Sequence, residues 1–260
     1  MTEQIGAVHT VGVVIPARNE QRLLPRCLAA VTAAIGQVRQ HDHTIRVHPI
    51  VVVDASDDRT LQIARSWPGV DTVVSDSGLV GAARRRGVDH LLASAGVDPR
   101  QVWICTTDAD SAVPADWLCT MLQHARSGTD LVLGTVRPDP DELAAGVLAA
   151  WRLRHEVTDG HSHVHGANMG VQGDMYGMAG GFPAVGAHED VMLAAAVRRL
   201  GGRIVSTASS PVLTSGRTAG RARGGMADYL ADLLDERLLD DLLEPRPQGH
   251  DPLLDRPREA

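Results

Sequence analysis

Residues 102–110 read Val-Trp-Ile-Cys-Thr-Thr-Asp-Ala-Asp, an apolar run typical of a buried strand that ends in two acidic residues one position apart. In open α/β sheets, ligands collect beyond the carboxyl ends of the strands, so Asp108 and Asp110 are expected where a substrate lies. Carboxylate oxygens suit a hard divalent cation, and the pair therefore indicates a metal-bound nucleotide diphosphate. The motif alone is weak, because acidic pairs also begin loops and cap helices.

Similar apolar runs surround this stretch, at residues 11–16, 48–53, 70–74 and 130–134. Segments with helical periodicity separate the runs, at residues 20–39, 58–67, 79–95 and 114–126. This alternation predicts an α/β fold with a mostly parallel central sheet that is flanked by helices on both faces.

The regular alternation ends near Pro138, and helices are then expected at about residues 141–157 and 189–200, with a short segment at 166–171 between them. A strand is expected before residue 214, and a last helix after the loop at 214–223. We expect one domain over residues 1–244, in which 10–137 form a nucleotide-binding half and 138–244 an acceptor-binding half. Residues 245–260 are rich in proline and charge, which is typical of a disordered tail.

Composition narrows the class of protein. The 260 residues carry a formal charge of -7, which argues against a nucleic-acid partner because phosphate backbones need a basic face. The three cysteines lack C-x-x-C spacing and are expected as free thiols in a reducing compartment. Without a transmembrane segment or a signal-peptide pattern, the sequence predicts a cytoplasmic protein.

Acidic residues also follow the first two expected strands. Asp54 comes directly after an apolar run, where its carboxylate can accept a hydrogen bond from a nucleobase. Asn19, Asp57 and Asp58 fit helix capping equally well. In the third helical segment, three arginines are adjacent, so only one can point inward, and Arg85 and Arg86 are expected on a solvated face.

Taken together, these motifs resemble those of family 2 glycosyltransferases, which have the GT-A (Rossmann-like) fold and depend on a nucleotide sugar. The resemblance covers roughly residues 10–220. It is carried by P-x-x-N-E at 16–20, D-x-S-x-D-x-T at 54–60, A-R-x-x-G at 83–87, D-x-D at 108–110, G-G-F at 180–182 and E-D at 189–190.

The resemblance implies a role for individual residues. Nucleotide binding is implied for Pro16, Arg18, Glu20, Asp54, Arg84 and Asp108. Asp108 and Asp110 would hold Mg²⁺ or Mn²⁺, and Asp190 would be the general base. The alternative for Glu189 and Asp190 is that they are acids placed in the first turn of a helix because the helix dipole favours them there. Gly181, Phe182 and Glu189 would lie beside the acceptor. Arg217 belongs to a basic loop, at residues 214–223, that is suited to contact the diphosphate or to link two elements.

Several points remain open at the level of sequence. Val53 and Arg85 depart from the family pattern and leave the nucleotide unassigned, and the Q-x-x-R-W motif of polymer-making members does not occur. We therefore expect transfer of a single sugar to a hydroxyl of a small molecule or a lipid-linked acceptor, with inversion. A retaining enzyme, a non-catalytic nucleotide-sugar binding protein and a metal-dependent phosphoester hydrolase are the alternatives. His161, His163 and His165 are expected as a polar pocket wall or an exposed loop rather than as zinc ligands.

Overall fold

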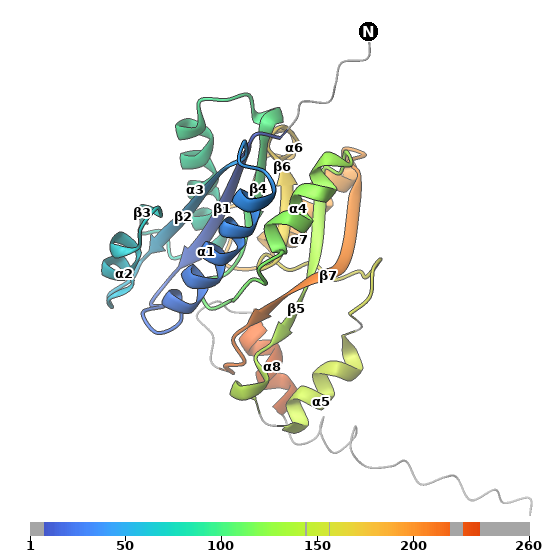
Figure 1. The fold of residues 1–260 in the computed structure, drawn as a ribbon. Coiled ribbons are helices and arrows are strands. Elements are labelled where there is room, and N and C mark those ends of the chain that lie inside the picture. Colours follow the sequence, from blue (N-terminus) through green and yellow to red (C-terminus); the bar gives the residue numbers. More distant parts are fainter. Residues whose placement is uncertain (1–7, 144, 156, 219–225, 235–260) are drawn as a thin grey trace, which may run out of the picture.

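The computed structural model describes residues 8–143, 145–155, 157–218 and 226–234, and these form a mixed α/β domain (Figure 1). Over these residues one seven-stranded sheet has the order β3-β2-β1-β4-β6-β5-β7. Its strands are β1 (Thr10–Ala17), β2 (Arg46–Asp54), β3 (Asp71–Ser75), β4 (Val102–Thr106), β5 (Leu131–Pro138), β6 (Met169–Gln172) and β7 (Ile204–Thr214). Only β6 runs antiparallel to its neighbours, so the prediction of a mostly parallel sheet is confirmed for this part of the chain.

Helices cover both faces of the sheet, as the alternation predicts. They are α1 (Leu24–His41), α2 (Thr60–Ser66), α3 (Val80–Ala95), α4 (Trp117–Arg126), α5 (Ala145–Arg154), α6 (Gly173–Met178), α7 (Glu189–Arg199) and α8 (Met226–Leu234). Successive strand residues point to opposite faces. Val13 accordingly packs in the core with α1, α4, α5 and α8, whereas Val14 packs in the core with α3, α6 and α7.

The second half departs from the expected boundaries. The helix predicted at 141–157 is divided into a 3-10 turn, Pro140–Glu142, and α5, because Leu143 between them has an extended backbone. The segment expected near 166–171 becomes β6, which enters the sheet between β4 and β5. The predicted tail at 245–260 lies outside the described residues. None of the helices in the described part is both long and apolar enough to cross a membrane.

The strand register brings the acidic motifs together. Val14 of β1 lies beside Ile50 of β2 and Thr106 of β4, so these three parallel strands end at the same edge of the sheet. The residues that follow them are the P-x-x-N-E segment, Asp54 and the D-x-D pair. Three motifs that lie far apart in the sequence therefore meet at one sheet edge, as expected for ligand sites in open α/β sheets.

Candidate active site

A cavity of about 780 Å³ opens at this edge of the sheet, a volume within the usual range for small-molecule sites. Ten residues singled out from the sequence line it: Pro16, Arg18, Glu20, Asp54, Arg84, Asp108, Asp110, Glu189, Asp190 and Arg217. The folded chain therefore joins the motifs at the ends of β1, β2 and β4 to the first turn of α7.

Asp54 is fixed at the end of β2 by a partner that the sequence did not indicate. The residue is only 4% exposed, and its Oδ1 accepts hydrogen bonds from the backbone N–H of Ser77 at 2.8 Å and from its hydroxyl at 3.0 Å. These contacts hold the carboxylate at the cavity wall.

The loops after β1 and β2 are joined by side-chain hydrogen bonds. Asp58 accepts the N–H of Thr60, the first residue of α2, at 2.8 Å, although Arg59 at the N-cap position makes no side-chain capping hydrogen bond. Asn19, by contrast, accepts the N–H of Asp57 from the other loop at 2.9 Å, and the N–H of Glu20 donates to Thr60 Oγ1 at 2.7 Å. Cross-loop bonding thus orients the backbone that carries Glu20 into the cavity.

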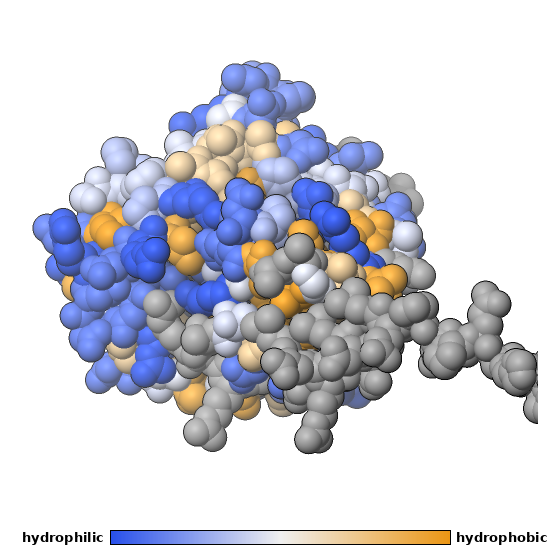
Figure 2. Space-filling view, turned by 90° about the horizontal axis from the view of Figure 1, so that it is seen from below, coloured by the Kyte–Doolittle hydropathy of each residue, from blue (hydrophilic) through white to orange (hydrophobic). Residues whose placement is uncertain are grey.

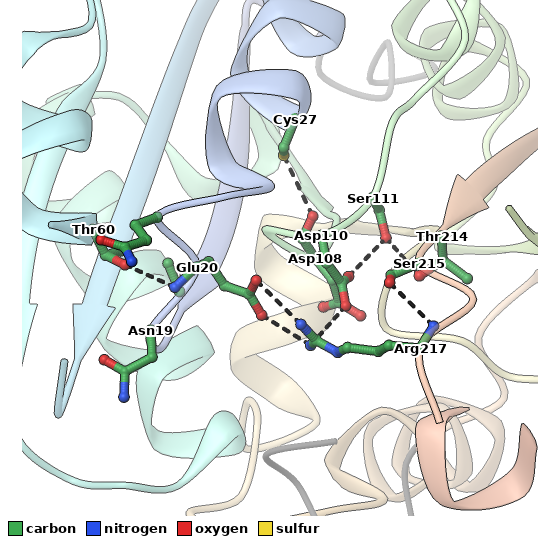
Figure 3. Close-up of polar contacts among 12 residues, drawn as sticks. Asn19, Glu20, Cys27, Thr60, Asp108, Asp110, Ser111, Thr214, Ser215 and Arg217 are labelled. Carbon is green, nitrogen blue, oxygen red and sulfur yellow. Dashed lines mark hydrogen bonds and ion pairs between the residues drawn. The ribbon is translucent and has the colours of Figure 1, made fainter. Parts of the chain in front are cut away.

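Arg217 places a positive charge among the acids of the site (Figure 3). Its Nη2 lies 2.9 Å from Oε1 of Glu20 and 2.8 Å from Oδ2 of Asp110. Burial, and next the charge of neighbouring Asp108, raise the pKa of Asp110 to about 6, although Arg217 opposes the shift. The site therefore holds several carboxylates partly out of water, which is unfavourable for their charged forms, and the positive charge of Arg217 offsets part of this cost.

Arg84 lies between the D-x-D motif and α7. Its guanidinium is paired with the carboxylates of Glu189 and Asp108. Arg84 and Glu189 are each only 3% exposed, whereas the side chain of Asp108 is 36% exposed. Because two carboxylates already engage this guanidinium, it ties the first turn of α7 to the end of β4.

Asp190 follows Glu189 on α7 and faces the cavity. Its Oδ2 accepts the backbone N–H of Gly166 at 2.6 Å, and its Oδ1 accepts the N–H of Val191 at 2.8 Å. The arrangement leaves a half-buried, oriented carboxylate in the wall of the cavity that the D-x-D motif also lines.

The G-G-F segment lies elsewhere than expected. Neither Gly181 nor Phe182 is among the cavity-lining residues, and Phe182 is fully buried. The N–H of Phe182 donates to Tyr176 Oη at 3.1 Å, and its carbonyl accepts Arg85 Nε at 2.6 Å. Arg85 is exposed, as predicted, and its hydrogen bonds also anchor this loop. Phe182 supports Arg84, whose guanidinium carbon lies 6.0 Å from the ring centroid.

Four ring-bearing side chains and two aliphatic ones, which sequence reasoning did not connect, line one part of the cavity. We call this set the ring wall; its members are Trp151, His155, Val164, His165, Met226 and Tyr229. Burial lowers the pKa of His165 to about 4, and burial also lowers the pKa of His155. Within the described residues, no group of three or more His, Cys, Asp and Glu side chains is arranged to hold a metal.

Comparison with known families and sequences gives a consistent result. The family model described as Glycosyl transferase family 2 matches residues 12–169. The undecaprenyl-phosphate 4-deoxy-4-formamido-L-arabinose transferases of Pseudomonas fluorescens (strain Pf0-1) and Aeromonas hydrophila are both 32% identical, over 139 and 132 residues. The first match covers 53% of this chain and 38% of that relative, and the second covers 50% and 37%. The chain thus matches well under half the length of these relatives.

Solved structures share the fold at low sequence identity. TarS 1-349 of S. aureus in complex with UDP-GlcNAc has a TM-score of 0.59 at 14% identity, covering 89% of this chain and 66% of that chain. A mannosyltransferase from Pyrobaculum calidifontis in complex with GDP-Man and Mn²⁺ has a TM-score of 0.57 at 20% identity, covering 81% and 58%. These likenesses confirm the GT-A fold predicted from the motifs.

Proposed function

Because the chain belongs to glycosyl transferase family 2, we propose that it moves a single sugar from a nucleotide-diphosphate sugar to an acceptor hydroxyl. One observation carries the proposal: the D-x-D acids after β4 and the oriented carboxylate of Asp190 line the same cavity. A donor and an acceptor bound there would meet between these two groups.

The donor would occupy the part of the cavity beyond β1 and β2. Pro16 and Asp54 would line the base and ribose pocket, and Asp54, held by Ser77, would accept a hydrogen bond from the base. Arg18 and Glu20 would lie along the same ligand. Arg84 would act on this side mainly by orienting Asp108, because its guanidinium is engaged by carboxylates.

The residues of the D-x-D motif fit a divalent cation. Between Glu20 and Asp110 the guanidinium of Arg217 already occupies a position that attracts positive charge, and the donor set consists of carboxylate oxygens, which suit Mg²⁺ or Mn²⁺. Asp108 and Asp110 would hold the ion, and the diphosphate of the donor would complete its ligands. When bound, such a cation stabilises the negative charge of the departing diphosphate. Arg217, released from Asp110, would then contact that diphosphate.

Asp190 would act as general base. The carboxylate would take the proton of the acceptor hydroxyl while the hydroxyl oxygen bonds to the anomeric carbon and the bond from that carbon to the diphosphate breaks. A direct displacement of this kind inverts the anomeric carbon. Buried Glu189, paired with Arg84, would keep the first turn of α7 in place rather than contact the acceptor.

The test compares wild type with Asp190→Asn, which preserves shape but removes the base. We expect transfer to fall by about 10² to 10⁴, with unchanged nucleotide binding. Binding is measured beforehand as the rise in Tm with UDP, GDP, ADP, CDP or dTDP, with and without Mn²⁺ or Mg²⁺. Full turnover by Asp190→Asn would contradict the base assignment.

Further outcomes of the same assay separate the alternatives. Product with a retained anomeric configuration would favour the retaining mechanism. Donor consumption at a rate that no acceptor changes would favour a hydrolase, and tight nucleotide binding without any turnover would favour a binding protein.

A further inference from the structure

We propose that Arg26, in the first turn of α1, is a positioning residue of the cation site. Its guanidinium contacts Asp139 and the backbone of Asp110 together, and thereby fixes the loop that carries the D-x-D acids. This inference rests on the proposed function, because it concerns the acids that we expect to hold the cation. It adds a role for two residues, Arg26 and Asp139, that do not line the cavity.

The guanidinium of Arg26 joins two segments that lie far apart in the sequence. Its Nη1 lies 2.5 Å from Oδ2 of Asp139, the residue after β5. Its Nη2 donates to the backbone carbonyl of Asp110 at 3.3 Å. A guanidinium can make both contacts at once, because its nitrogens are held in a rigid, planar fork. One side chain of α1 thus connects the D-x-D loop to the end of β5.

The burial of Asp139 distinguishes this ion pair from surface charges. Hydrophilic residues make up much of the described surface seen from below in Figure 2, and ion pairs on such surfaces contribute little to stability. Asp139, by contrast, is only 7% exposed. Its Oδ1 accepts the N–H of Asp141 at 3.1 Å, and its own N–H donates to the carbonyl of Thr214 at 2.7 Å. The partner of Arg26 is therefore itself held in place.

Further contacts hold the same loop from α1 and from β7 (Figure 3). The thiol of Cys27 in α1 donates to the carbonyl of Asp108 at 3.3 Å. On the other side, the hydroxyl oxygen of Ser111 lies 3.0 Å from Oγ1 of Thr214 and 3.3 Å from Oδ1 of Asp110. The backbone carbonyls of both D-x-D acids are therefore bound by α1, which restricts the backbone that carries the two carboxylates.

This restriction matters for a cation, because residues behind metal ligands orient those ligands. Loss of such a residue typically lowers metal affinity by about 10- to 100-fold. An ion pair that only stabilised the fold would behave differently. Its removal would lower the stability of the whole chain, without a specific effect on the D-x-D loop.

The first experiment removes the ion pair without changing the net charge, because an unpaired charge near the D-x-D acids would itself alter cation binding. Arg26→Met with Asp139→Asn meets this condition, and the asparagine keeps an oxygen for the N–H of Asp141. Electron paramagnetic resonance of free Mn²⁺ at pH 8 should show binding about 10-fold weaker than in wild type. Arg126→Met with Asp42→Asn removes an ion pair outside the cavity and should leave Mn²⁺ binding unchanged.

Arg26→Lys provides a milder variant should the double variant fail to fold. It keeps a positive charge beside Asp139 but lacks the rigid fork that reaches the Asp110 carbonyl as well. We expect its midpoint of urea unfolding to stay close to that of wild type, while Mn²⁺ binds about 3-fold more weakly or less tightly still.

Amide hydrogen exchange, followed by mass spectrometry, tests the loop itself without metal. The N–H of Ser111 donates to the carbonyl of Asp108 at 3.0 Å. In Arg26→Met with Asp139→Asn, the amides of residues 108–112 should exchange about 10-fold faster, because the loop opens locally more often. The amides of β2 should keep their wild-type rates.

Wild-type exchange in the D-x-D loop, or an equal acceleration in the loop and in β2, would overturn the inference. Wild-type Mn²⁺ affinity in the variants of Arg26 would also overturn it, but would leave the proposed function standing. Absence of Mn²⁺ binding in wild type would instead reject the cation site, and with it the role given to Arg26.

Discussion

Arg217 and Asp110 form an ion pair across the cavity, with Nη2 of the arginine 2.8 Å from Oδ2 of the aspartate. The same nitrogen lies 2.9 Å from Oε1 of Glu20, so one guanidinium joins two acids from different strand ends. Arg217 thus pairs with the carboxylate that we expect to hold a cation. The two cations therefore compete for Asp110.

Competition predicts opposite effects of Arg217→Ala on two binding reactions. Free Mn²⁺ should bind about 5- to 10-fold more tightly, because loss of a partly buried ion pair removes roughly 1 kcal/mol of competition. The nucleoside diphosphate with Mn²⁺ should bind more weakly, because the guanidinium no longer contacts the phosphates. Electron paramagnetic resonance of free Mn²⁺ at pH 8, where Asp110 is ionised, measures the first effect.

Asp110→Asn is the control for this experiment, and it should abolish tight Mn²⁺ binding in either background. Unchanged or weaker binding of free Mn²⁺ to Arg217→Ala would show that Arg217 supports the cation site instead of competing for it.

The buried pair of Arg84 and Glu189 predicts a large loss of stability on substitution. Arg84→Met leaves the buried carboxylate of Glu189 without its partner, which costs about 3 to 5 kcal/mol in the free energy of unfolding. Arg84→Met with Glu189→Gln should cost less than Arg84→Met alone, because no unpaired charge remains. Urea unfolding measures all three proteins.

Arg86→Met is the matched control, because Arg86 is exposed and only its Nε donates, to the Val74 carbonyl at 3.2 Å. Its free energy of unfolding should stay within about 0.5 kcal/mol of wild type. An equal effect of Arg84→Met and Arg86→Met would contradict the structural role given to Arg84.

The first half of the fold and the acids of the site follow from local sequence patterns. Short apolar runs that end in Asp54 or in the D-x-D pair identify both the strand and its functional end, because parallel strands share one edge. The ring wall had no such signal apart from His165, which was expected in a pocket wall or an exposed loop. Trp151 and Tyr229 come from helices 78 positions apart in sequence and meet only through packing of α5 on α8.

Arg85 lies on the solvated face predicted for it, but its contact with Phe182 and the burial of that phenylalanine were not predicted, for a related reason. A sequence motif indicates which residue types lie near a site, but solvent exposure and cavity contact depend on tertiary packing. In the structure the arginine bonds to the phenylalanine carbonyl, and both serve the loop rather than a ligand. Only the fold distinguishes a residue that touches a ligand from one that holds its neighbour.

The buried imidazole of His165 predicts loss of stability in mild acid. Its pKa is lowered from 6.5 to about 4 in the folded protein, chiefly by burial, so the unfolded chain binds the proton more strongly. The stabilisation is complete above about pH 6.5 and is lost as the pH falls toward 4. Between pH 7.5 and pH 5 the free energy of unfolding should fall by about 2 kcal/mol from this residue.

Urea unfolding at the two pH values checks this prediction in wild type and in His165→Asn, which cannot be protonated in this range. The variant should lose about 2 kcal/mol less than wild type over the same interval. His41→Asn, at an exposed position, is the control. The same pH dependence in wild type and His165→Asn would assign the acid sensitivity to other groups.

Gly166 lies between the carboxylate of Asp190 and the guanidinium of Arg84. Its N–H donates to Asp190 at 2.6 Å, its carbonyl accepts the hydroxyl of Thr106 at 2.7 Å, and a Cβ added to it would lie 2.3 to 2.6 Å from the guanidinium of Arg84. That guanidinium cannot easily move away, because Glu189 and Asp108 hold it. Gly166→Ala should therefore displace the backbone that orients Asp190.

We expect Gly166→Ala to lower the free energy of unfolding by about 1 to 3 kcal/mol, as overpacking does, and to reduce transfer about 10-fold or more through Asp190. Gly177→Ala is the control, because its added Cβ would meet nothing within 4 Å in helix α6. In an Arg84→Met background the clash with the guanidinium is gone, so adding Gly166→Ala should cost less than in wild type. Equal costs in the two backgrounds would show that the guanidinium of Arg84 is not what requires glycine at position 166.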